Sequence, residues 1–280
     1  MKLIKLLFAS LLFFKCLLAF PQDNIAKVYL DENLTEIDSS TYSRKCRRLL
    51  FKCLEYRTDR LVVNKILEKY RFGKLNPIEY KQVKGVISRI SKLKIESDKI
   101  MVIKYYDSLL NFSSVNRRHI EHTKPKKTTS PDSSNSTKRP PHPFNVDIFN
   151  KNRRKWVKKN KKCIERNENK YNVEIIYIYK AEQNVISKYE GFNWVEDNGV
   201  LKNQFFKIMF NFHLLIIKPN GEYFLSGGHV TDKKVGKLLK NADWTEFKSD
   251  LKSSHSKHIF KGVGLFKRVD PYYHNTKHCF

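Results

Sequence analysis

The chain contains few acidic residues and no pair of cysteines spaced as C-x-x-C. Its 280 residues include 28 Asp and Glu against 55 Lys and Arg, which gives a formal charge of +27 at pH 7. No two of its five cysteines stand three positions apart, so neither a zinc ribbon nor a dithiol redox site is predicted. No His-Asn-His motif and no pair of acids supports nuclease chemistry. The sequence therefore predicts no catalytic residue, no metal site and no cofactor.

The chain also lacks an uninterrupted apolar run long enough to cross a membrane. At its start, Lys2 and Lys5 precede the apolar residues 6–14, and Lys15 ends that run short of the ~20 residues that a span needs. Ala19 supplies a small residue near a suitable cleavage point. We predict that residues 1–20 are a signal peptide and that the mature protein is periplasmic or extracellular, without a transmembrane span. An uncleaved membrane anchor is the alternative.

The excess of basic residues indicates acidic partners. Removal of Lys2, Lys5 and Lys15 with the signal peptide lowers the formal charge only from +27 to +24. A surface this basic attracts polyanions such as lipopolysaccharide, nucleic acid or an anionic membrane surface. The alternative is that the charge is spread evenly and reflects composition alone.

Four cysteines remain after the signal peptide: Cys46, Cys53, Cys163 and Cys279. Cys46 and Cys53 lie seven apart in a helical pattern, which would place their Cα atoms ~10 Å apart, too far for a disulfide. Each could instead pair with Cys163 or Cys279, giving up to two disulfides in an oxidising compartment. Buried, unreactive thiols are the alternative for at least two of the four.

The first part of the mature chain is predicted to be helical. Residues 21–40 are polar without a sustained period, which favours a flexible lead-in. From 41 to 67, apolar residues recur mostly at steps of three and four, as on one face of a helix. Asn76, Pro77 and Glu79 then form the pattern of a helix start, with Asn76 as N-cap. A small helical module over residues 41–95 is predicted.

The rest of the chain alternates strand and helix patterns around one polar insertion. Residues 116–144 are rich in Pro, Ser and Lys and, from 122 on, contain almost nothing that could form a core, so disorder is predicted there. A turn at Pro219-Asn220-Gly221 between two apolar runs predicts a hairpin. The predicted elements are strands at 99–106 and 173–179, helices at 147–171, 201–209, 232–240 and around 244–251, a loop at 189–200, a hairpin at 213–225, and a last strand at 262–266.

The helix predicted at 147–171 carries the most basic stretch of the chain. Trp156 and Cys163 lie near one face of this helix, and cations surround that face. A helix of this kind binds phosphate or another polyanion by releasing its counterions. The alternative is a solvated outer face of a helix whose Trp156 packs on a sheet. The candidate polyanion-binding residues are Lys151, Arg153, Arg154, Lys155, Lys158, Lys159, Lys161 and Lys162.

Histidines gather in the last quarter of the chain, at 229, 255, 258, 274 and 278. His255 and His258 stand three apart and could face one way on a helix, as metal ligands do. No cysteine or carboxylate at ligand spacing accompanies them, so surface histidines are predicted.

The order of the predicted elements resembles the thioredoxin fold. A strand, a helix, a second strand, a helix, a hairpin and a closing helix follow one another over residues 99–245. The resemblance implies right-handed crossovers and a central mixed sheet flanked by helices. The fold class expected is therefore α/β: a thioredoxin-like domain over 96–280, interrupted by the insertion and preceded by the small helical module.

Two departures from that family bear on function. The redox cysteine pair of a thioredoxin follows the first central strand, but the residues from Asp107 onward contain no cysteine there. The family's cis-proline precedes the hairpin strand, where this chain has Asn211, Phe212 and His213. We expect a non-catalytic, exported protein that binds a ligand or associates with the cell envelope. The alternatives are an atypical thiol oxidoreductase that uses the four cysteines, and a secreted nuclease or toxin.

Overall fold

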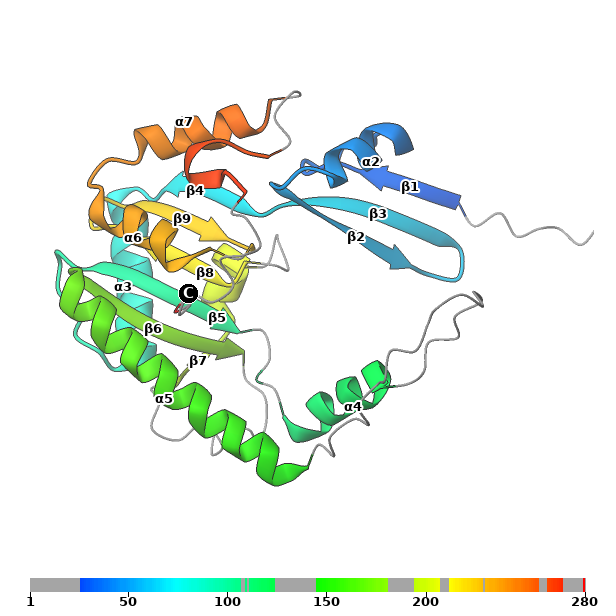
Figure 1. The fold of residues 1–280 in the computed structure, drawn as a ribbon. Helices are drawn as coiled ribbons and strands as arrows, with labels where there is room; N and C mark the ends of the chain where they lie inside the picture. The colour runs from blue at the N-terminus through cyan, green and yellow to red at the C-terminus, as the bar shows by residue number, and fades with distance from the viewer. Residues whose placement is uncertain are drawn as a thin grey trace, which may run out of the picture. The chain divides into compact units, whose positions relative to one another are not determined.

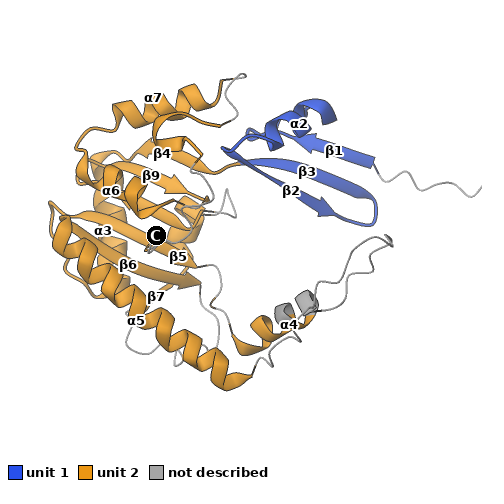
Figure 2. Cartoon of the chain, viewed as in Figure 1, with its two compact units in different colours: residues 1–67 blue, residues 68–280 orange. Residues whose placement is uncertain are grey.

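A computed structural model describes most of the chain after residue 25, in two compact units. Residues 1–67 form unit 1 and residues 68–280 form unit 2 (Figure 2). The predicted signal peptide at 1–20 lies outside the described residues. The described residues are 26–106, 109, 111–123, 145–180, 194–206, 212–228, 230–256, 261–268 and 279.

Unit 1 is a three-stranded sheet with one helix. Strand β1 (Ala26–Leu30) is followed by helix α2 (Ser39–Cys46), and β2 (Phe51–Arg57) and β3 (Leu61–Glu68) complete the sheet in the order β1-β3-β2. β1 pairs with β3 in parallel. The turn between β2 and β3 is closed by Thr58, whose hydroxyl accepts a hydrogen bond from the Leu61 amide.

The helices predicted over residues 51–67 are wrong, because the structure forms β2 and β3 there. In β3 most of the buried residues alternate with half-buried ones, which is the period of a strand with one covered face. Its β-branched residues, such as Val62, Val63 and Ile66, favour extended backbone. Apolar steps of four fit both periods, so the spacing alone misled the prediction. Residues 26–30, expected in a flexible lead-in, form β1.

The distance predicted between Cys46 and Cys53 is also wrong. The two residues form a disulfide with a Cα–Cα distance of 5.7 Å. Helix α2 ends at Cys46, and the chain turns before β2 brings Cys53 back beside it. The rise of a continuous helix therefore does not apply between them.

Unit 2 is built on a six-stranded mixed sheet. Its strands are β4 (Tyr70–Lys74), β5 (Ile100–Tyr106), β6 (Val173–Lys180), β7 (Trp194–Asp197), β8 (Leu214–Ile217) and β9 (Glu222–Ser226). They lie in the order β4-β9-β8-β5-β6-β7. β6 is parallel to both β5 and β7. β8 is antiparallel to β5 and β9, and β4 is antiparallel to β9.

Helices cover both faces of this sheet (Figure 1). α3 (Pro77–Ser91) lies on one face, and α5 (Val146–Lys170) and α6 (Asp232–Lys240) lie on the other. Alternate side chains of β6 point to opposite faces. Ile176 belongs to the core under α3, and Tyr177 contacts Trp156 of α5. α4 (Phe112–Thr123) and α7 (Thr245–Ser254) complete the helices described in unit 2.

The predicted start of α3 is confirmed. The Asn76 side chain accepts hydrogen bonds from the amides of Ile78 and Glu79, and the Glu79 carboxylate accepts one from the Asn76 amide. This reciprocal capping satisfies amide groups that a helix start leaves without partners. Pro77 occupies the first helical position, where its missing amide hydrogen costs nothing.

The predicted hairpin is confirmed as β8 and β9. All four residues of β8 are buried, as expected for a strand covered on both faces. At the turn, Gly221 has φ +83°, and its amide donates to the Lys218 carbonyl. A side chain at Gly221 would meet the carbonyl oxygen of Leu75. The turn therefore requires glycine for both its conformation and its packing.

Other predicted elements change in detail. The loop predicted at 189–200 contains β7, whereas residues 189–193 lie outside the described residues. The helix predicted at 201–209 is described only as the π-helical turn Lys202–Phe206. The strand predicted at 262–266 is wrong: positive φ angles at Gly262 and Gly264 lead into a 3₁₀ turn. Of the insertion predicted to be disordered, residues 116–123 belong to α4, and 124–144 are not described.

The predicted α/β class is confirmed as a mixed α/β protein with two sheets. Within the residues that the structure describes, no helix is both long enough and apolar enough to span a membrane.

Candidate functional site

Helix α5 is the longest helix described and carries the predicted basic stretch. The Asn145 side chain caps it by accepting a hydrogen bond from the Ile148 amide, and Asp147 places a negative charge in the first turn. An acid at this end interacts favourably with the helix dipole. Ten cations against three acids give this 25-residue segment a net charge of +7.

The buried face of α5 is fixed to the sheet by aromatic residues. Trp156 stacks on Trp194 of β7 with ring centroids 5.8 Å apart. The edges of Tyr106 and Tyr177 complete this cluster around Trp156, with centroid distances of 6.3 Å. Trp156 is therefore a packing residue at the junction of α5 with the sheet, and it is not displayed as a stacking platform for a ligand.

Polar side chains on the same face are satisfied within the protein. The Tyr177 hydroxyl donates to Asn160 Oδ1 at 3.0 Å, and Asn160 Nδ2 donates to the Trp156 carbonyl. Asn167 Nδ2 likewise donates to the Cys163 carbonyl. Burial raises the pKa of Tyr177 far above its ordinary range. These contacts fix the rotation of α5, so its opposite face is held towards solvent.

Seven of the eight predicted cations lie on that solvent face. Arg153 is the exception: it is half-buried, and its guanidinium lies 5.2 Å from the centroid of the Phe149 ring. The exposed seven form a surface that we name the α5 basic face: Lys151, Arg154, Lys155, Lys158, Lys159, Lys161 and Lys162.

The α5 basic face is not interrupted by acidic residues, which occur on this helix only before it, at Asp147, and after it, at Glu165 and Glu168. No acidic residue occurs between Lys151 and Lys162, and none of the seven cations forms an ion pair with any residue that the structure describes. Lys151, Lys155, Lys158 and Lys162 follow steps of four, three and four, which place them along one side of the helix. Their row extends over about 16 Å.

The cysteines predicted as possible disulfide partners form two bridges. Cys163 in α5 is bonded to Cys279, and their Cα atoms are 5.4 Å apart. Together with the bridge between Cys46 and Cys53, this gives the two disulfides predicted. The predicted pairing of Cys46 or Cys53 with Cys163 or Cys279 is wrong. Cys163 and Cys279 are both buried, so the bridge is shielded from solvent.

A cluster of charged groups surrounds Cys279. Asp232, at the start of α6, accepts a hydrogen bond from the Cys279 amide at 2.6 Å, and its other oxygen pairs with Arg166 at 3.1 Å. Arg166 also contacts the sulfur of Cys279. Lys104 of β5 donates to the Cys279 carbonyl at 2.7 Å. The cluster therefore fastens this C-terminal residue to β5, α5 and α6.

Sequence reasoning missed Lys104, although a signal was present. It is the only charged residue inside the apolar strand β5, where a cation has to find a buried partner. Lys104 is 8% exposed and lies 5.0 Å from the centroid of the Tyr177 ring. Burial lowers its pKa to about 8, although the negative charge of Asp232 opposes that shift.

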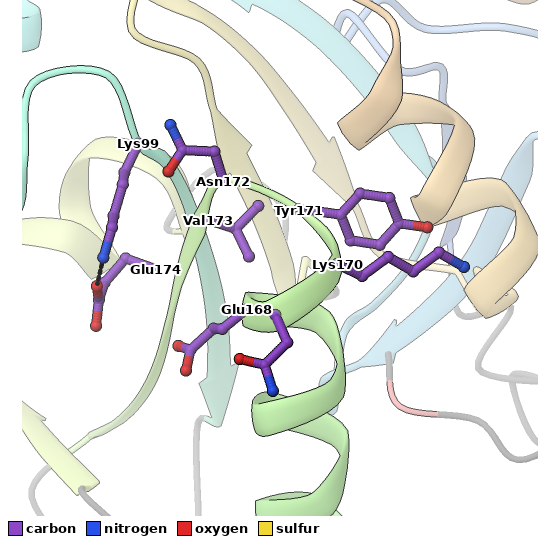
Figure 3. A pocket seen from close by; sticks show the side chains of 8 residues that line it. Lys99, Glu168, Lys170, Tyr171, Asn172, Val173 and Glu174 are labelled. Atoms are coloured by element: carbon purple, nitrogen blue, oxygen red, sulfur yellow. Dashed lines mark hydrogen bonds and ion pairs between the residues drawn. The ribbon is translucent and has the colours of Figure 1, made fainter.

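A pocket of about 520 Å³ lies where α5 leads into β6 (Figure 3). Lys99 and Glu174 form an ion pair at 3.3 Å across it. Glu168 accepts a hydrogen bond from the Ile175 amide, and burial raises the pKa of Glu168 above its ordinary value. These charged groups are bound to partners within the protein, so the pocket fits a structural role better than that of a ligand site.

Of the five histidines in the last quarter of the chain, the structure describes His255, which is half-buried and forms the C-cap of α7. His229, His258, His274 and His278 lie outside the described residues, and so does the proposed pairing of His255 with His258. Within the described part of the chain, no group of three His, Cys, Asp or Glu side chains could hold a metal ion.

The chain matches no protein-family model, no curated protein and no solved structure. The α5 basic face is consequently the candidate site on its own geometry: a fixed helix, seven exposed cations and no neighbouring acid among them.

Proposed function

We propose that the protein is an exported, non-catalytic binding protein that uses the α5 basic face to hold a polyanion at the cell envelope. The observation that carries the proposal is the segregation of charge on α5. Seven exposed cations lie within twelve residues that contain no acid, while the opposite face of the helix is fixed to the sheet. Lys and Arg arranged in this way bind phosphate or sulfate groups chiefly by counterion release.

The fold supports a thioredoxin-like domain in unit 2 as part of this proposal. β5, α5 and the parallel β6 are followed by the antiparallel β8 and β9 and by α6, which is the order that the resemblance implies. β4 and β7 extend the sheet beyond that pattern at both edges. Because no cysteine pair directly follows β5, the domain would serve as a scaffold for binding rather than for dithiol exchange.

Export is supported by the N-terminal sequence and by the two disulfides. Disulfides form and persist in oxidising compartments such as the periplasm or the extracellular space. The polyanions available there are lipopolysaccharide, an anionic membrane surface and released nucleic acid. A thiol oxidoreductase that uses Cys163 and Cys279 is the less favoured alternative, because both are buried and exchange requires access to a sulfur.

The test is a binding titration of the mature protein against lipopolysaccharide, DNA, RNA and anionic vesicles over a series of salt concentrations. In the test variant, Lys158, Lys159, Lys161 and Lys162 are replaced by Gln. In the control variant the same replacement is made at four exposed lysines outside α5: Lys81, Lys94, Lys233 and Lys237.

We expect the test variant to bind less tightly and to lose part of the salt dependence, by about 0.9 in the log–log slope per phosphate contact removed on duplex DNA. The control variant, with the same net charge, should lose much less. Equal weakening of both variants against every ligand would show that the charge acts only as composition, and the proposal would then be wrong.

A further inference from the structure

The strand β4 forms one edge of the sheet in unit 2, and part of its backbone pairs with no residue that the structure describes. The Leu75 amide donates to the Gly221 carbonyl, and the Gly227 amide donates to the Lys69 carbonyl. Residues that exchange hydrogen bonds with β9 alternate along an antiparallel pair, so Arg71 and Gly73 face β9 between these two contacts.

The backbone groups of Tyr70, Phe72 and Lys74 consequently point away from β9, towards the open edge. No described residue forms a backbone hydrogen bond with these three outside the sheet ladder. An edge with outward N–H and C=O groups can accept an additional strand.

A groove follows this edge along its whole length. All five residues of β4 line it, together with residues of α7 that include Leu251 and Lys252, and its volume is about 520 Å³. Figure 1 shows α7 running beside β4 at this end of the sheet. Phe72 and Leu251 are half-buried and supply apolar contact area. Backbone partners, apolar surface and space therefore coincide in one place.

The groove is positively charged. Arg71, Lys74, Lys248 and Lys252 all line it, against a single carboxylate, Glu68. Glu68 pairs with Arg71 at 3.3 Å, and Lys248 pairs with Glu222 at the start of β9. Lys74 and Lys252 are exposed and form no ion pair with a described residue. These two cations favour acidic side chains in whatever occupies the groove.

We propose that the groove between β4 and α7 binds an extended acidic peptide segment of a partner protein, which adds to β4 as a seventh strand of the sheet. Hydrogen bonds to Tyr70, Phe72 and Lys74 hold the backbone of the segment, and its carboxylates meet Lys74 and Lys252. A second copy of β4 does not fit this role, because Arg71 and Lys74 would face like charges.

This site is separate from the α5 basic face. β4 lies four strand positions from β6, against which α5 packs, and that corresponds to about 19 Å across the sheet. The two surfaces can therefore be tested independently, and the peptide site does not depend on the polyanion proposal.

The test uses the full mature protein and a fluorescent decapeptide of alternating Val and Glu as probe. Two further versions of the peptide carry backbone N-methyl groups, on all Val residues in one and on all Glu residues in the other. Both methylated peptides keep the charge and lose the same number of N–H donors. For a given direction of the added strand, only one of the two sets of N–H groups can face β4 while the carboxylates face the lysines.

We expect saturable binding of the parent peptide and a loss of about tenfold or more for one methylated version only, since two to three hydrogen bonds disappear. Lys252→Glu should weaken binding, whereas Lys240→Glu, an equal charge change at an exposed position on α6, should leave it nearly unchanged. Equal binding of all three peptides, equal effects of the two substitutions, or no saturable binding by the folded protein would overturn the proposal.

Discussion

Lys104, in the middle of the central strand β5, donates a hydrogen bond from Nζ to the carbonyl oxygen of Cys279 at 2.7 Å. The contact joins residues separated by 175 positions and is buried. Cys279 is also bonded to Cys163 of α5 and donates its amide to Asp232 of α6. One residue near the C-terminus thus connects the sheet to two helices that pack on the same face.

The buried amine of Lys104 predicts a specific pH dependence of stability. Its pKa is about 8 in the folded protein, against an ordinary value of 10.5. Between these values the unfolded chain binds more protons than the folded one, so this residue adds stability as the pH rises. In this range, the free energy of unfolding of the wild type should rise relative to that of Lys104→Met by up to about 1.4 kcal/mol per pH unit. Urea unfolding at several pH values measures the difference. Lys240→Met, at an exposed position, should show no such gain, and a flat difference for Lys104→Met would contradict the prediction.

The two disulfides should stabilise the protein by different amounts. The bridge between Cys163 and Cys279 closes a segment with a sequence separation of 116, and that between Cys46 and Cys53 one of 7. Loop-closure entropy predicts about 4–5 kcal/mol for the first and about 2 kcal/mol for the second. Calorimetry of the two double Cys→Ser variants measures each loss, the first in unit 2 and the second in unit 1. The reverse order of losses would argue against this account.

The parts of the fold that the sequence predicted are those with strong local patterns. β5, β6 and β8 are short apolar runs bounded by polar residues, and the start of α3 depends on neighbours within four positions. The α5 basic face was predictable for the same reason, because its charges and its buried residues separate on one helix. Arg153 deviates since it lies over Phe149, and a helical period does not show that contact.

The parts that were missed depend on residues far apart in the chain. β4 exists because Tyr70–Lys74 pairs with Glu222–Ser226, and neither segment alone indicates the other. β7 is four residues long and is fixed by its parallel pairing with β6. The bridge between Cys46 and Cys53 needed the turn after α2, which the helical spacing concealed. Pairing partners of this kind require three-dimensional information.

Glu222, the first residue of β9, should be an acid-sensitive group. Burial opposes its ionisation, but hydrogen bonds from Lys248 and Asn220, with the charges of Lys248 and Lys218, outweigh burial and hold its pKa below the ordinary value of 4.5. The carboxylate therefore adds stability that is present above that value and is lost as the pH falls through the lower folded pKa.

Glu222→Gln tests this directly. Because Lys218 is almost fully buried beside Glu222, we expect a loss of about 1–3 kcal/mol at neutral pH, measured by urea unfolding. The difference from wild type should shrink as the pH falls from 4.5 through the lower folded pKa, because below that pKa Glu222 is protonated and uncharged, as Gln is. Glu165→Gln, at an exposed position on α5, is the control and should change little. If the difference in free energy of unfolding between wild type and Glu222→Gln stayed constant at low pH, Glu222 would not be an acid-sensitive group.

Two glycines of unit 2 should respond to alanine in opposite directions. Gly221 has φ +83°, and an added Cβ would clash with the carbonyl oxygen of Leu75. Gly85 lies on the exposed side of α3, and nothing stands within 4 Å of the position of its Cβ. We expect Gly221→Ala to lower the free energy of unfolding by about 1–3 kcal/mol, because a strained backbone and a backbone clash combine. Gly85→Ala should raise it by about 0.5–1 kcal/mol, because alanine loses less conformational entropy in a helix.

Urea unfolding of the two variants measures the sign of each change in the free energy of unfolding. The pair separates the requirement of the turn for glycine from any general effect of an added methyl group. Equal shifts of the same sign would mean that the hairpin turn relaxes around the new side chain and does not depend on glycine.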